Sequence, residues 1–186
     1  MLQKVTLDYD FTPLLCADYR KYDSCYDPDY WPSKTDEGRV YDSVLKELII
    51  EPESPHLNMD NTMVSMIEWD RSQLDFDAIG KQLDMDVVTV WSIKQQPQNI
   101  VPLHTDQFRT VRGMVPDHPG TICRVVIHLE NWHPGQFIEY NGDVDTQWTQ
   151  GDGCMFGEDV LHLSANCGDH PKYTMQVSGY ATTNTI

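Results

Sequence analysis

Residues 122–140 read ICRVVIHLENWHPGQFIEY and hold two β-rich runs on either side of a polar turn. The first run, residues 122–129, contains many β-branched residues, and the second, residues 136–140, is rich in aromatic and β-branched residues. Runs of this kind, separated here by Pro134 and Gly135, are typical of β-strands joined by a turn. The stretch therefore predicts a strand–turn–strand unit.

The same pattern covers most of the chain after Asp84. Seven short β-rich runs are separated by Gly, Pro, Asn and Asp, at residues 87–96, 99–104, 122–132, 136–140, 153–156, 160–166 and 173–182. Seven or eight short strands with turn residues between them, and no intervening helices, are typical of a β-sandwich or barrel. At this level a purely structural β-sandwich fits the pattern as well as an enzyme does.

The first 85 residues have a different character. The first third of the chain is rich in Asp, Tyr and Pro, as at residues 17–38, with too many aromatic residues for a typical disordered tail, so we expect ordered loops and short strands packed on the core. Apolar residues share one helical face over residues 39–50, and a second short helix is expected over residues 75–83. We expect one domain over residues 1–186, with a helical and loop support region at 1–85 and a β core at 86–186.

The composition speaks against a nucleic-acid-binding protein and against a membrane-spanning one. The formal net charge of −16 speaks against nucleic acid as a partner, because phosphates are held by clusters of Lys and Arg. The five cysteines are scattered without a CxxC pair, and the first residues lack an apolar signal region, which favours a reducing cytoplasmic compartment. No apolar run approaches the length of a membrane span.

The segment PLHTDQF, residues 102–108, places His104 and Asp106 two positions apart. On a strand such residues point to the same face and can bind one ion. Composition alone can supply such a pair, and a second one, His128 with Glu130, is also present. His162 in VLHLSAN is the best candidate for a third ligand, because a neighbouring antiparallel strand could bring it beside His104. Two histidines and one carboxylate suit non-heme Fe(II).

Two basic residues are candidates for binding an anion near this metal. Lys172 lies ten residues after His162, at the start of the last predicted strand, in a chain with 13 basic and 29 acidic residues. Its alternative is an ordinary lysine at a strand end. Arg124 begins the run RVVIHL, and its alternative is a partner in a surface ion pair.

Residues 88–182 resemble the aspartyl/asparaginyl β-hydroxylase group of 2-oxoglutarate/Fe(II)-dependent oxygenases. CRVVIHLENWHPGQFI is similar to the strand of that family that bears Arg and His. WTQGDGCMFGEDVLHLSANCGDHPKYTMQV follows the family's order of Trp, Gly, Phe, an acidic pair, the distal His, Asn and a basic residue. The same motifs resemble small oxygenases encoded by marine cyanobacterial viruses.

The resemblance implies a mainly β fold with a few helices and a double-stranded β-helix (jelly-roll, cupin-like) core. It implies that Fe(II) is held by His104, Asp106 and His162, and that Lys172 binds the C5 carboxylate of 2-oxoglutarate. Further candidate contacts to this cosubstrate are His128, at its C1 end, Arg124 and Asn166. The alternative role of Asn166 is to cap the end of its strand. The chain departs from the family in two ways: the family often has Arg in place of Lys172, and some of its members lack the carboxylate ligand.

The implied function is an Fe(II)- and 2-oxoglutarate-dependent dioxygenase with O2 as cosubstrate. It would hydroxylate a C–H bond of a peptidyl or free amino acid, or of another small substrate, and release succinate and CO2. Asp106 favours hydroxylation, because halogenating relatives vacate that ligand for a halide. The alternatives are a cupin-like Zn or Mn protein (isomerase, hydrolase or sensor) and a non-enzymatic β-sandwich interaction protein. The expected location is the cytoplasm, or the host cytoplasm for a virus-encoded protein.

Overall fold

Two antiparallel sheets make up most of the computed structural model, which describes residues 2–21 and 64–182. The larger sheet has the order β1 (Leu2–Thr6), β9 (Asp152–Phe156), β6 (Thr121–His128), β11 (Lys172–Ala181), β4 (Met85–Gln95), β3 (Ser65–Trp69) and β2 (Arg20–Lys21). The smaller sheet has the order β5 (Asn99–His104), β10 (His162–Asn166), β7 (Gln136–Tyr140) and β8 (Asp143–Asp145). Three helices accompany them in these ranges: α1 (Thr12–Leu15), α4 (Phe76–Leu83) and α5 (Arg109–Met114).

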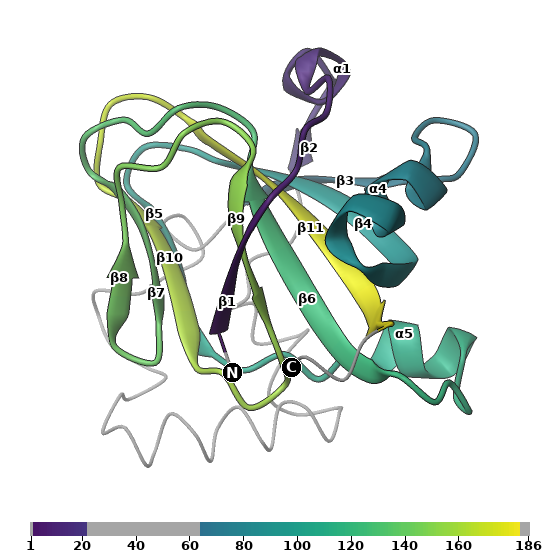
Figure 1. The fold of residues 1–186 in the computed structure, drawn as a ribbon. Helices are drawn as coiled ribbons and strands as arrows, with labels where there is room; N and C mark the ends of the chain where they lie inside the picture. The colour runs from purple at the N-terminus through teal and green to yellow at the C-terminus, as the bar shows by residue number, and fades with distance from the viewer. Residues whose placement is uncertain (1, 22–63, 183–186) are drawn as a thin grey trace.

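From β4 onward the strands are shared between the sheets in the order of a double-stranded β-helix. Strands β4, β6, β9 and β11 lie in the larger sheet, and β5, β7, β8 and β10 lie in the smaller one (Figure 1). Eight antiparallel strands divided in this way between two sheets form a jelly roll. The predicted fold class, a mainly β protein with a few helices around a double-stranded β-helix core, is therefore confirmed.

The N-terminal part of the chain extends the larger sheet at both edges. Strand β1 pairs with β9 at one edge, and β3 pairs with β4 and β2 at the other. Helix α4 confirms the helix predicted over residues 75–83: Asp75 caps it by accepting a hydrogen bond from the Ala78 backbone N–H. The helix expected over residues 39–50 lies outside the described residues. The division of the chain at residue 85 stays a prediction.

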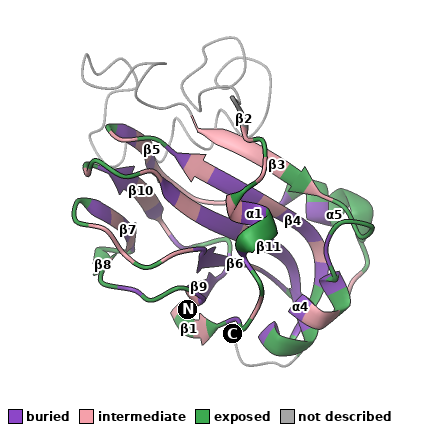
Figure 2. Ribbon diagram, turned by 90° about the horizontal axis from the view of Figure 1, so that it is seen from above, coloured by how far each residue is buried: buried purple, intermediate pink, exposed green. Residues whose placement is uncertain are grey.

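Alternating residues of β6 separate the apolar core from the interior of the barrel. Val125 and Ile127 are fully buried and belong to a cluster that also contains residues of α1 and α4. Arg124, Val126 and His128 alternate with them and so face the smaller sheet. Figure 2 shows the buried residues gathered along β4, β6 and β11. This alternation brings polar side chains into the space between the sheets.

All seven strands predicted after Asp84 are present, but the structure adds two elements. Strand β8 is short and polar; it forms because Asn141 and Gly142, both with positive φ, make the tight turn that pairs it with β7. Helix α5 lies between β5 and β6, so the prediction of no intervening helices was wrong. Its Val111 belongs to an apolar cluster with the neighbouring Phe108 and with Ile122 of β6 and Tyr180 of β11, and local periodicity does not reveal contacts with those two strands.

None of the helices in the ranges that the structure covers has the length and apolar character needed to cross a bilayer.

Candidate metal centre

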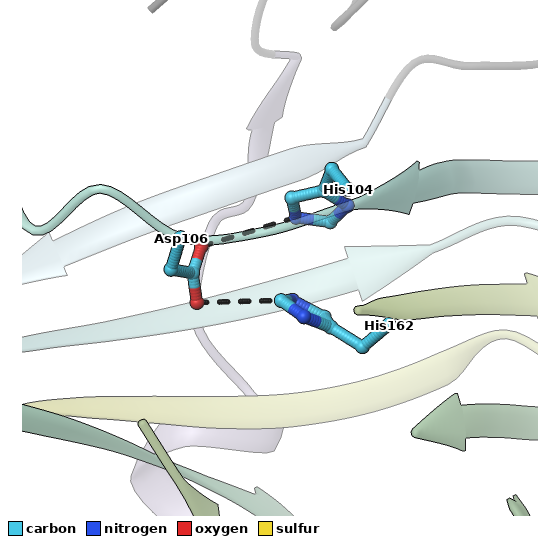
Figure 3. Close-up of side chains that lie close together, drawn as sticks. All are labelled: His104, Asp106 and His162. Atoms are coloured by element: carbon cyan, nitrogen blue, oxygen red, sulfur yellow. Dashed lines mark ion pairs between the residues drawn. The ribbon is translucent and has the colours of Figure 1, made fainter. Parts of the chain in front are cut away.

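Strand pairing brings His104 and His162 together with Asp106. His104 ends β5, His162 begins β10, and the two residues are direct partners in the antiparallel ladder. Asp106 follows His104 by two residues, and its carboxylate faces both rings (Figure 3). His104 Nε2 lies 3.9 Å from Oδ1 of Asp106, and His162 Nε2 lies 3.7 Å from Oδ2. One potential ligand atom from each residue lies within 4.8 Å of the others.

Each of the two histidines is held in the tautomer that a metal requires. Nδ1 of His104 lies 2.7 Å from the carbonyl oxygen of Pro102, and Nδ1 of His162 lies 3.0 Å from that of Val160. A carbonyl oxygen only accepts hydrogen bonds, so Nδ1 carries the proton and Nε2 keeps its lone pair for a metal. Burial, followed by the charges of His104 and Arg124, lowers the pKa of His162 to about 3, against the opposing effect of Asp106. His162 is therefore neutral at pH 7.

The two carboxylate oxygens of Asp106 have different environments. Oδ1 accepts a hydrogen bond from Nη1 of Arg124 at 2.7 Å, whereas Oδ2 is buried and has no hydrogen-bond partner among the described residues. Burial acts to raise the pKa of Asp106, but the charges of Arg124 and the two histidines outweigh it, and the pKa lies below its usual value. A buried anionic oxygen without a donor is costly, and a bound cation would remove that cost.

The donor set fits a divalent transition metal. Two imidazole nitrogens and one carboxylate oxygen form the 2-His-1-carboxylate set, which suits non-heme Fe(II). In the part of the chain that the structure describes, these three residues are the one group of three or more potential ligands that converge. The rival pair, His128 with Glu130, belongs to no such group there.

Lys172 lies inside the barrel and is not an exposed lysine at a strand end. Its side chain is 2% exposed, and Nζ donates to the Phe137 carbonyl oxygen at 2.9 Å, Ser164 Oγ at 2.6 Å and the Ala165 carbonyl oxygen at 3.1 Å. Burial lowers the pKa of Lys172 to about 7. None of these three partners is a carboxylate. Ser164 is two residues from His162 on the same face of β10, a distance of about 6–7 Å along a strand.

Arg124 lies at the candidate metal centre and not beside Lys172. Besides Asp106, it contacts Ser178 Oγ through Nε at 3.0 Å, and its guanidinium lies 5.3 Å from the ring centre of Phe108. The alternative of a surface ion pair does not describe this position, because its partner Asp106 is only 9% exposed.

His128 faces the barrel interior at a level closer to Lys172. It is 1% exposed, stacks on Trp148 with ring centres 3.6 Å apart, and points Nε2 at Asp145 Oδ2 at 3.4 Å. Burial, with a smaller effect of the Lys172 and Lys4 charges, lowers its pKa against the effect of Asp145. Its Nδ1 has no hydrogen-bond partner in the described ranges.

Asn166 has contacts that match its alternative role at the strand end. Its amide donates to the carbonyl oxygens of Gln95 at 3.0 Å and His170 at 2.8 Å, and its Oδ1 accepts from the Gly168 N–H at 3.2 Å. These bonds tie the end of β10 to the following loop and to the end of β4. A contact between Asn166 and a cosubstrate stays a prediction.

Sequence reasoning missed two further polar residues inside the barrel. Tyr140 is the ladder partner of His162, and Gln136 is that of Asn166, so both face the interior. Tyr140 OH and Gln136 Oε1 are buried without a hydrogen-bond partner among the residues described. The spacing of 136 and 140 in QFIEY, four residues apart on a strand, is the signal that would have placed them on one face.

Comparisons with known proteins give low similarities. No family model and no curated protein sequence matches the chain. Among solved structures, a Pseudomonas putida prolyl-4-hydroxylase is similar at 16% identity and a TM-score of 0.47, over 90% of this chain and 95% of that one. A Burkholderia pseudomallei oxidoreductase of the 2OG-Fe(II) oxygenase family is similar at 12% identity and a TM-score of 0.40, over 66% and 68% of the two chains. A predicted oxalate decarboxylase from Thermotoga maritima is similar at 16% identity and a TM-score of 0.41, over 63% and 81%. The fold is therefore assigned from the strand order, and the function has to be argued from the site.

Proposed function

We propose that this protein is an Fe(II)- and 2-oxoglutarate-dependent dioxygenase. It hydroxylates a C–H bond of a peptidyl or free amino acid, or of another small substrate, and releases succinate and CO2. One observation carries the proposal: a single barrel interior holds both a His–Asp–His ligand set and a buried lysine that contacts the strand of His162 two residues further along.

The metal would be held by His104 Nε2, Asp106 Oδ2 and His162 Nε2, the atoms that the hydrogen bonds leave without a proton or a donor. Three protein ligands leave further positions for other molecules to bind. Iron bound there supplies redox chemistry with O2 that amino-acid side chains do not supply. The protein's own part is to orient Nε2 of both histidines toward the metal and to hold Asp106 as a carboxylate.

The buried ammonium of Lys172 supports the proposal that the cosubstrate carries a carboxylate. A buried ammonium without an anionic partner is unfavourable, and a bound carboxylate would compensate for it. The chain's net charge of −16 repels a dianion such as 2-oxoglutarate, so a cation inside the barrel is the feature that allows the dianion to bind. The arriving carboxylate would replace one of the three present acceptors, of which the Ser164 hydroxyl is the one side-chain group; it keeps its own hydrogen bond to Gln95 Oε1 at 2.8 Å.

The polar atoms without partners support a polar ligand in the same space. His128 Nδ1, Gln136 Oε1 and Tyr140 OH all lie on inward-facing positions of β6 and β7. Buried polar atoms in folded proteins nearly always have a hydrogen-bond partner. The Tyr140 hydroxyl can donate to a carboxylate or 2-oxo oxygen, whereas Gln136 Oε1 is an acceptor, and so is His128 Nδ1 when Nε2 donates to Asp145; these two atoms need a donor from a substrate or a water molecule.

The alternative of a cupin-like metalloprotein that does not use 2-oxoglutarate shares the metal ligands but gives Lys172 no role. Asp106 supports hydroxylation within the oxygenase proposal, because its carboxylate fills the position that a halide would need.

The test is a crystal structure with Mn(II) and 2-oxoglutarate, together with an assay for succinate from the Fe(II)-loaded protein. The expected structure has the metal on His104, Asp106 and His162, and the C5 carboxylate on Lys172. A metal bound by His128 and Glu130 would contradict the assignment of the metal ligands. Metal on the expected residues without 2-oxoglutarate binding, and without succinate across a broad mixture of substrates, would favour the cupin-like alternative.

A further inference from the structure

Arg124 is fixed by contacts with two segments of the chain, the loop between β5 and α5 and strand β11. Nη1 donates to Asp106 Oδ1 at 2.7 Å, and Nε donates to Ser178 Oγ of β11 at 3.0 Å. The guanidinium also lies over the ring of Phe108, 5.3 Å from its centre. A guanidinium presents its donors in a planar, rigid fork, so holding Nε also fixes the direction of Nη1. Arg124 therefore holds one particular oxygen of Asp106.

The consequence for Asp106 is that its two oxygens are not equivalent. Oδ1 is engaged by Arg124, and Oδ2 is buried without a donor in the described residues and lies 3.7 Å from His162 Nε2. A carboxylate can bind a metal through one oxygen or through both. With Oδ1 engaged, Oδ2 is the oxygen left for a metal.

We propose that Arg124 is a positioning residue that makes Asp106 bind the metal through Oδ2 alone. The inference rests on the proposed function, because it takes Asp106 to be a metal ligand. Binding through one oxygen keeps one more metal position open for an exogenous ligand than binding through both. Partners of metal ligands of this kind typically change metal affinity by about 10–100-fold when they are removed.

A competing physical account makes the opposite prediction. In that account Arg124 only neutralises a buried carboxylate in the metal-free protein, and its positive charge opposes a divalent cation. Removing Arg124 would then leave metal affinity unchanged or increase it. The sign of the change in affinity distinguishes the two accounts.

The experiment measures Co(II) affinity and the Co(II) ligand-field spectrum without O2 or cosubstrate. Arg124→Gln is expected to weaken Co(II) binding about 10–100-fold and to change the spectrum, which reports the coordination number. Arg124→Lys is expected to recover part of the affinity, since an ammonium reaches Asp106 as a point charge but does not hold Ser178 at the same time. Arg112→Gln is the matched control: Arg112 is half exposed, pairs with Glu158, and its loss leaves affinity and spectrum unchanged.

Ser178→Ala gives a second variant that keeps every charge and removes only the hydrogen bond to Nε. It is expected to weaken Co(II) binding less than Arg124→Gln does and to shift the spectrum in the same direction. If Arg124→Gln does not fold, Ser178→Ala decides the question by itself. Unchanged or tighter Co(II) binding, with or without a change in the spectrum, would overturn the role of Arg124. Asp106→Ala tests the metal site itself. If this variant keeps full Co(II) affinity, Asp106 is not a ligand, and the proposed function is overturned rather than the role of Arg124 alone.

Discussion

His104 and His162 lie directly opposite each other on the antiparallel strands β5 and β10, with ring centres 4.2 Å apart. Each ring donates its Nδ1–H to the carbonyl oxygen two residues before it, so the ladder and the local backbone together orient both Nε2 atoms. The pairing places Asp106 beside them because it follows His104 by two residues. A metal centre thus depends on the register of one strand pair.

His104→Ala is expected to weaken Fe(II) or Co(II) binding by more than about 100-fold, since loss of a supporting partner alone costs about 10–100-fold. Isothermal titration with Co(II) measures the change. His118→Ala is the matched control, because His118 pairs with Asp86 and stacks on Tyr180, outside the proposed ligand set. Equal Co(II) affinity in the two variants would contradict the assignment of His104.

The affinity for 2-oxoglutarate is expected to fall as pH rises above about 7. Burial lowers the pKa of Lys172 to about 7, so the free protein loses this positive charge in that range. The neighbouring titratable groups are His128, whose pKa is lowered, and Cys167, whose charge acts to raise the pKa of Lys172. Titration of the Mn(II)-loaded protein between pH 6.5 and about 9 should show up to a tenfold loss per pH unit.

Lys172→Arg is the matched variant for this pH dependence. Its guanidinium stays charged over the whole range, so its affinity for 2-oxoglutarate should be nearly independent of pH. A wild-type affinity that is also independent of pH would show that Lys172 does not bind the carboxylate in its charged form.

The stability of the ligand-free protein should also depend on Lys172. Its pKa is about 7 in the folded state, against 10.5 for an ordinary lysine, the pKa expected in the unfolded chain. Between these pH values the unfolded chain binds a proton that the folded protein does not, so stability rises with pH; below about 7 the cost of the buried charge is fully present. Urea unfolding should give a slope up to about 1.4 kcal/mol per pH unit larger than that of Lys172→Met. Parallel slopes in the two proteins would mean that Lys172 titrates near its usual pKa.

Tyr140→Phe and Tyr180→Phe should separate a ligand contact from a structural one. Tyr140 OH is buried without a partner in the described ranges, and burial raises its pKa well above the usual value, so removing the hydroxyl should leave the free energy of unfolding unchanged or slightly higher. Tyr180 OH donates to the Val115 carbonyl oxygen at 2.8 Å, so its removal should cost about 1 kcal/mol. Affinity for 2-oxoglutarate should fall about tenfold in Tyr140→Phe only. A larger loss of stability in Tyr140→Phe than in Tyr180→Phe would mean that Tyr140 has a structural role.

Much of the fold was predictable because its signals are local. The β-rich runs, the turns between them and the helix over residues 75–83 follow from periodicity and turn residues, and all are present in the structure. The prediction that His104 and Asp106 share the face of one strand was wrong, because β5 ends at His104; Asp106 lies in the loop that follows, and Arg124 holds it toward the two histidines. Strand β8 and helix α5 have little local signal, since β8 depends on pairing with β7 and α5 on apolar residues of β6 and β11. The sequence also did not place β1, α1 and β3 in the first 85 residues.

The sequence by itself determined the seven β-rich strands after Asp84 and, within each of them, which side chains share a face, since a strand repeats every two residues. Only the tertiary structure decided that His162 lies opposite His104, that Arg124 holds Asp106, and that Lys172 is buried without a carboxylate partner among the described residues. These relationships depend on strand register and on contacts between distant segments. No local pattern specifies them, because they are set by packing the two sheets against each other.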